Sequence, residues 1–189
     1  MENDKYQKIW EKAEPLLLKA KKKDFLLHSK MVERAMKEII AGEGGNPDIL
    51  IPAAILHDVG WSEVSTELQY ANDEENKTKA LVEHIKQALP LIRKILSELD
   101  YDEDKIDKII DLIAAHKFTD PEEKDKQMLI DADTLSDTYK ESFYSDVKSY
   151  NSTPRKTLEF RSKNTFYTKT AKEIFEKHFK DRLKEINES

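Results

Sequence analysis

The stretch PDILIPAAILHDVGW, residues 47–61, contains the most strongly apolar helix that the sequence predicts. Pro47 favours a helix start, because proline is well accommodated in the first helical turn, and Gly60 favours a helix end. Between them, apolar residues occupy nearly the whole circumference of the helix rather than one stripe. A helix of this kind is buried on all sides, so the rest of the chain is expected to pack around it.

The remaining sequence has the spacing of amphipathic helices. Only 4 Gly and 6 Pro occur in 189 residues, which leaves little material for hairpin turns, and apolar residues recur at steps of three and four. We expect an all-α bundle of about six to eight helices in a single domain, residues 1–189. The expected helices cover about residues 3–23, 24–42, 47–60, 76–99, 102–116, 128–135 and 164 onward, with loop or weak helix at 62–78 and an ambiguous aromatic segment at 139–150.

Composition excludes several classes of function. The chain has no cysteine, which excludes a disulfide scaffold, a thiolate zinc site and a cysteine nucleophile. The net charge of -6 argues against a nucleic-acid surface, because phosphate neutralisation needs a basic patch. The sequence shows no membrane span and no export signal, so a cytoplasmic location is expected, with no membrane partner. Small-molecule substrates stay open, and the chain is expected to be a monomer or homodimer.

Histidines are scarce, and four of the five fall on helix faces that the pattern predicts to be buried. A buried imidazole needs hydrogen-bond partners or a metal ion, because an unsatisfied polar group costs about 1–3 kcal/mol. Any one of them alone is read as a satisfied core residue, but four together with nearby acids favour a functional site. His178, in EKHFKDR, is read as a surface residue. The four buried histidines are His28, His57, His84 and His116.

Two acidic motifs accompany these histidines. His57 and Asp58 are adjacent, so their side chains point about 100° apart on a regular helix and converge only if the helix ends there, as Gly60 would allow by departing from helical angles. Asp58 has an alternative role as a cap of the next turn. In LIDADTLSD, Asp131 and Asp133 lie about 200° apart on a helix, so one of them is expected to face an ion and the other is not.

The ordered motifs LLHSKMVERA, AAILHDVGW and LIDADTLSD resemble the HD domain superfamily of metal-dependent phosphohydrolases over about residues 25–135. The family pattern is a lone His, then a His-Asp pair, then a distant Asp. The resemblance implies that His28, His57, Asp58 and Asp131 hold one divalent ion. It favours Asp131 over Asp133, because the family's distant Asp usually precedes an Ala-Asp pair, and Asp133 would then make supporting contacts.

The same resemblance suggests further roles. His84 and His116 stand where many members carry additional histidines that bind a second metal or the substrate phosphate; within about 8 Å of His57-Asp58 they would do so, and otherwise they are core residues. Lys117 and Lys30 are weaker phosphate-binding candidates, each read more readily as a surface lysine. Two imidazoles and two carboxylates suit Mn, Fe, Co, Ni or Zn, with Mg possible. Asp58 is also the candidate catalytic residue that orients or deprotonates water.

The expected function is therefore metal-dependent hydrolysis of a phosphate ester or anhydride in a small substrate, with a nucleotide as the expected compound. Phosphatase, pyrophosphatase and phosphodiesterase activity all stay open. One departure from the family is Trp61, which stands where nucleotidase-like members often have Glu; Glu63 is the nearest acid and its role is open. The alternatives are a non-catalytic metal- or nucleotide-binding regulatory domain and a purely structural helical protein.

Overall fold

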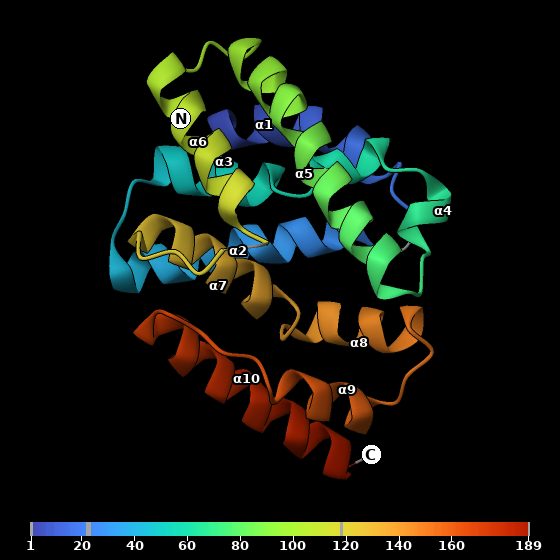
Figure 1. Cartoon of the computed structure of the whole chain (residues 1–189). Helices are drawn as coiled ribbons and strands as arrows, with labels where there is room; N and C mark the ends of the chain where they lie inside the picture. The colour runs from blue at the N-terminus through green and yellow to red at the C-terminus, as the bar shows by residue number, and fades with distance from the viewer. Residues whose placement is uncertain (1, 22–23, 118, 189) are drawn as a thin grey trace.

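The computed structural model describes residues 2–21, 24–117 and 119–188. Within these ranges the chain forms ten α-helices, one short 3-10 helix and no strand (Figure 1), which confirms the all-α prediction. The helices outnumber the expected six to eight because short helices form in the polar segment after Trp61, in the ambiguous aromatic segment and at Pro154–Arg161. The elements are α1 Glu2–Leu17, α2 Phe25–Glu43, α3 Pro47–Leu56, η1 Val59–Glu63, α4 Thr66–Gln69, α5 Glu74–Ser97, α6 Glu103–Ala115, α7 Lys124–Ser136, α8 Lys140–Ser149, α9 Pro154–Arg161 and α10 Lys169–Glu188.

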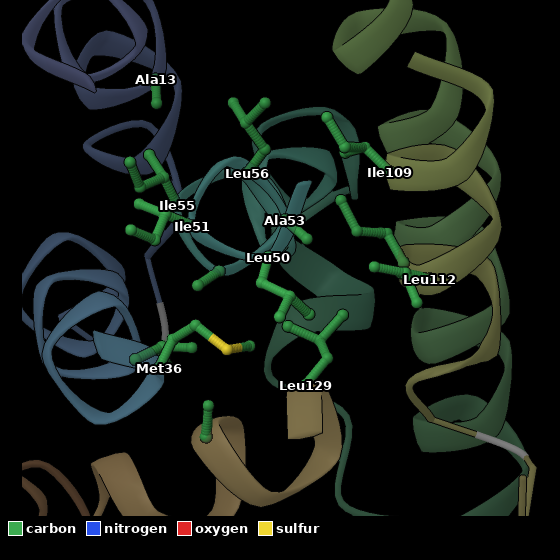
Figure 2. Close-up of a cluster of buried hydrophobic side chains, with 14 of the residues drawn as sticks. Ala13, Met36, Leu50, Ile51, Ala53, Ile55, Leu56, Ile109, Leu112 and Leu129 are labelled. Atoms are coloured by element: carbon green, nitrogen blue, oxygen red, sulfur yellow. The ribbon is translucent and has the colours of Figure 1, made fainter. Parts of the chain in front are cut away.

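The helix α3 is the centre of the core, as its sequence predicts. Asn46 caps it by accepting a hydrogen bond from the Asp48 amide, Pro47 occupies its first turn, and every residue from Ile49 to Leu56 is buried. Figure 2 shows side chains of α3 directed to several sides at once, towards Ala13 of α1 and Leu129 of α7 among others. Full burial of one large aliphatic side chain contributes about 1.5–3 kcal/mol, so α3 supplies a large share of the hydrophobic stabilisation.

The other helices surround α3 in a way that brings distant sequence segments to its C-terminal end. The helices α1, α2, α6 and α7 all pack against α3, and α2 also packs along α7. The helix α5 packs against η1, the segment that follows α3 directly. In Figure 1, α8, α9 and α10 lie together on the side of the molecule beyond α7. None of the helices in the described ranges has the length and apolarity needed to cross a bilayer.

Candidate metal centre

The chain leaves helical geometry between His57 and Asp58, and this change brings the two side chains together. His57, the C-cap residue of α3, keeps helical angles (φ -56°, ψ -32°), whereas Asp58, the residue before η1, has φ -107° and ψ 5°. His57 Nε2 then lies 3.2 Å from Asp58 Oδ2. The prediction that these neighbours converge at a helix end is confirmed.

Gly60 contributes to this geometry differently from the expectation. It does not adopt a positive φ. A Cβ atom at this position would lie 2.0 Å from the His84 carbonyl oxygen and 2.7 Å from the Ala88 amide nitrogen. Glycine is therefore required because η1 and α5 approach closely here, and this approach places His84 beside Asp58.

The first donor set consists of two imidazoles and two carboxylates from the helices α2 and α7 and from the junction between α3 and η1. His28 Nε2, from α2, lies 3.3 Å from His57 Nε2 and 3.3 Å from Asp58 Oδ2. Asp133 Oδ1, from α7, lies 3.0 Å from His28 Nε2 and 3.7 Å from His57 Nε2. The side chains of His28, His57 and Asp58 are at most 4% exposed. His28, His57 and Asp58 form a group whose ligand atoms all lie within 4.8 Å of one another.

Hydrogen bonds on the far side of each ring assign the protons of this set. His57 Nδ1 lies 2.9 Å from the Ala54 carbonyl oxygen, to which it can only donate. Ser136 Oγ donates to the Asp133 carbonyl, so at 3.0 Å it accepts from His28 Nδ1. Both imidazoles therefore carry their proton on Nδ1 when neutral, and their Nε2 lone pairs face each other and the carboxylate oxygens. In this form, four acceptor atoms face one another, an arrangement that a bound cation would stabilise.

A second donor set lies on the other side of Asp58. His84 Nε2 is 3.4 Å from Asp58 Oδ1, and the His84 and His116 ring centroids are 5.7 Å apart. His116 Nδ1 donates to the Ile113 carbonyl, which leaves its Nε2 unprotonated in the neutral ring. Asp58 Oδ1, His84 Nε2 and His116 Nε2 are all buried without a hydrogen-bond partner, and the three residues form a second possible metal group. His84 and His116 are thus brought to the His57-Asp58 pair.

The structure places Asp133, and not the expected Asp131, beside the histidines. Asp131 is fully buried, but it accepts hydrogen bonds from the Tyr167 amide at 2.9 Å and from the Thr168 amide and hydroxyl at 2.7 Å each. These donors lie at the start of α10, so Asp131 anchors that helix to α7. Asp133 occupies the opposite side of α7 and faces the histidines, as the angular separation of the two residues requires.

With this geometry in place, a scan against protein-family models identifies an HD domain over residues 25–139, more than half of the chain. The chain belongs to the HD domain family. Comparison with curated proteins and with solved structures gave no match. HD domains are typically metal-dependent hydrolases that bind divalent ions, and both donor sets described above lie inside the matched residues.

The protonation states in this HD domain suit metal binding. Burial lowers the pKa of His84 to about 4 and holds the pKa of His116 well below its usual value, so both rings are neutral at pH 7. Burial opposes ionisation of Asp58, but nearby positive charge, including that of Lys117, holds the pKa of Asp58 well below its usual range. The pKa of Asp133 also lies well below its usual range, because the Lys117 charge outweighs the effect of burial. Neutral imidazoles and ionised carboxylates are the forms that ligate metals.

The weaker candidate residues of the HD domain differ in their distance from the donor atoms. Lys117 reaches the site and forms an ion pair with Asp133 Oδ2. Lys30 does not, because it is exposed and lies over the Trp10 ring, 6.0 Å from its centroid. Glu63 is exposed and bonded to Ser62, away from the donor atoms. His178 is half-buried rather than at the surface, because Thr138 and the Tyr139 ring contact it.

Sequence reasoning missed two groups that contact His28. Ser136 and Asp137 both lie near its Nδ1, with Asp137 Oδ1 at 3.4 Å. Asp137 follows Asp133 by one helical turn, so the four-residue spacing in LIDADTLSD was a usable signal. Arg161 of α9 pairs with Asp137, and no local pattern links these two residues across the intervening chain.

A cavity of about 440 Å³ opens onto the first donor set of the HD domain. Its wall includes His28, Asp58 and Asp133 together with the cations Lys77, Lys117 and Arg161. Trp61, which stands in place of the glutamate of nucleotidase-like members, stacks on His84 with ring centroids 4.8 Å apart and planes 11° apart. The aromatic part of the lining consists of Phe25, Trp61 and Tyr150.

Proposed function

We propose that this HD domain is a phosphohydrolase with two adjacent divalent-cation sites that share Asp58. The observation that carries the proposal is the convergence of histidine nitrogens and carboxylate oxygens in two groups that share Asp58. In the first set, His28 Nε2, His57 Nε2, Asp58 Oδ2 and Asp133 Oδ1 face one another. In the second, Asp58 Oδ1 and the Nε2 atoms of His84 and His116 are buried without hydrogen bonds. A structural helical protein would leave these groups unsatisfied at a cost of about 1–3 kcal/mol each.

The donor chemistry fits a transition metal. Imidazole nitrogens together with carboxylate oxygens suit Mn, Fe, Co, Ni or Zn, and the absence of cysteine removes thiolate competition. When bound, such ions lower the pKa of coordinated water and neutralise charge on a phosphate group. In the described wall of the cavity, the three carboxylates of Asp58, Asp133 and Asp137 equal in number the cations Lys77, Lys117 and Arg161. A bound divalent cation would shift this balance towards positive charge and favour a phosphate.

The protein groups have separable tasks in hydrolysis. Asp58 presents one oxygen to each donor set, which supports a role for its carboxylate in orienting or deprotonating the attacking water. Lys117 lies in the cavity wall beside Asp133, where its ammonium group meets a phosphate oxygen. His28 and His57 keep their Nε2 atoms directed at the site because their Nδ1 atoms donate elsewhere.

The cavity supports a nucleotide as substrate. Its volume of about 440 Å³ lies within the range of small-molecule sites, and the metal-binding carboxylates occupy one part of its wall. Lys77 and Lys117 provide positive charge for further phosphate oxygens. Phe25, Trp61 and Tyr150 provide aromatic surface for a planar base. This combination matches a phosphorylated compound that carries a ring.

The test is a nucleotide panel assayed with metal-loaded protein, with phosphate and pyrophosphate detected separately under Mn, Co, Ni, Zn and Mg. We expect release from at least one nucleotide, and a loss of at least about 100-fold in Asp58→Asn, the size of effect expected for a general base. Lys30→Ala is the matched control, because Lys30 neighbours His28 in sequence but faces Trp10. Metal binding without release from any compound would contradict the proposal and favour a non-catalytic binding domain.

A further inference from the structure

Arg161 is a cation of α9, outside the residues that match the family, yet it lies in the wall of the catalytic cavity. Its side chain is only 14% exposed and lies between two carboxylates. Nη1 is 2.9 Å from Asp137 Oδ2, and Nη2 is 2.5 Å from Asp146 Oδ2. Asp146 belongs to α8 and is 3% exposed, so it fixes the guanidinium from the side away from the site.

Asp137 connects this cation to the metal centre. One of its oxygens faces Arg161, and the other, Oδ1, lies 3.4 Å from His28 Nδ1. Ser136 Oγ lies 3.0 Å from the same nitrogen. The resulting series of contacts runs from Asp146 through Arg161 and Asp137 to His28, whose Nε2 belongs to the first donor set.

We propose that Arg161 is a positioning residue for the metal ligand His28. It holds the Asp137 carboxylate beside His28 Nδ1, so that the ring keeps its proton on Nδ1 and its Nε2 lone pair directed at the cation site. The inference rests on the proposed metal centre and extends it to the C-terminal helices. Groups that accept the second ring proton of a metal-bound histidine set its tautomer and orientation.

Electrostatics explains why Asp137 needs this partner. Its side chain is 15% exposed and lies on the same face of α7 as Asp133, one turn away. Two poorly solvated carboxylates near Asp58 repel each other, and a guanidinium between Asp137 and Asp146 offsets this repulsion. Lysine replaces the arginine poorly here, because an ammonium group cannot match the planar, two-armed geometry.

The experiment is a calorimetric Mn²⁺ titration of the metal-free full chain in wild type, Arg161→Met, Asp137→Asn and the double variant. We expect Mn²⁺ affinity to fall about 10- to 100-fold in each single variant, the usual effect of losing an outer ligand-supporting group. The double variant should be no weaker than the weaker single variant, because the two residues act in series. Arg155→Met is the matched control, since Arg155 lies on the same helix but bonds Asn187 at the surface and should leave the affinity unchanged.

A second readout separates positioning from general stability. Histidine ¹⁵N spectra of the metal-free protein report the tautomer of His28, assigned with His28→Gln. In wild type and Arg155→Met, His28 should be in the Nδ1–H form. In Arg161→Met, it should be a mixture of the two tautomers. If Arg161→Met does not fold, Arg161→Lys replaces it and should also show a mixture. An unchanged tautomer and Mn²⁺ affinity in the Arg161 variants, or additive losses in the double variant, would overturn the inference. If wild type binds no Mn²⁺, the proposed metal centre itself fails.

Discussion

Asp131 and Asp133 lie two residues apart on α7 but belong to different parts of the molecule. Asp133 Oδ1 lies 3.0 Å from His28 Nε2 at the candidate metal centre. Asp131 accepts hydrogen bonds from Tyr167 and Thr168 at the start of α10. One carboxylate is placed to bind an ion, and the other joins the C-terminal helix to the family core.

This division predicts opposite effects for two conservative substitutions. Asp133→Asn should weaken Mn²⁺ binding by more than about 100-fold, because a direct ligand contributes more than a residue that only supports a ligand. The stability of the metal-free protein should change little. Asp131→Asn should lower the free energy of unfolding by about 1–3 kcal/mol, because its amide group meets three donors, and it should leave Mn²⁺ affinity unchanged. Urea unfolding in EDTA and Mn²⁺ titration measure the two quantities. If Asp131→Asn weakened Mn²⁺ binding and Asp133→Asn did not, Asp131 would be the metal ligand.

Gly60 gives a prediction about packing. Gly60→Ala places a Cβ within 2.0 Å of backbone in α5, so η1 and α5 must separate. We expect a loss of about 1–3 kcal/mol in unfolding free energy, typical of overpacking, and weaker metal binding at the set that contains His84. Gly44→Ala is the comparison, because no atom lies within 4 Å of its Cβ position and its positive φ alone causes strain. Normal metal stoichiometry in Gly60→Ala would contradict the proposed role of this close approach.

The lowered pKa of His84 predicts a pH dependence of stability. Its folded pKa is about 4, and an unfolded histidine titrates near about 6.5, so the unfolded state binds more protons between these values. Stability of the metal-free protein should therefore fall as the pH decreases from about 7 towards 4, with about 2 kcal/mol lost by pH 5 through this residue. Urea unfolding in EDTA at pH 7 and pH 5 measures the loss, which should be smaller in His84→Gln. Equal losses in both proteins would show that His84 is not the source.

Chelation predicts a loss of stability in the loaded protein. A metal present at about 100 times its dissociation constant stabilises the folded state by about 2.7 kcal/mol, so excess EDTA should lower the melting temperature by several degrees. In Asp58→Ala, which removes a ligand from both donor sets, EDTA should have little effect. A similar EDTA response in both proteins would indicate a metal bound elsewhere.

Much of the fold followed from local patterns. The central burial of α3, the all-helical architecture and the convergence of His57 with Asp58 are all consequences of helical periodicity and of a helix end at a known position. The reason for glycine at position 60 does not follow from local patterns, because a sequence shows that a glycine is present but not which neighbour excludes a side chain there.

The candidate site was only partly predictable. Helical periodicity predicts that Asp131 and Asp133 face different ways, but both side chains pack against other helices or segments, so the pattern does not say which of them faces the histidines. That depends on how α7 is rotated against α2 and α10. The role of Arg161 depends on the placement of α8 and α9 beside α7, which tertiary packing decides and no local motif encodes.

The most direct test of the two-site centre is the number of divalent ions bound per chain, measured by mass spectrometry after Mn²⁺ loading and gel filtration. The structure predicts two ions in the wild type, one in the His84→Gln/His116→Gln double variant, and none in Asp58→Ala. Wild-type protein that is folded and retains no metal would contradict the account.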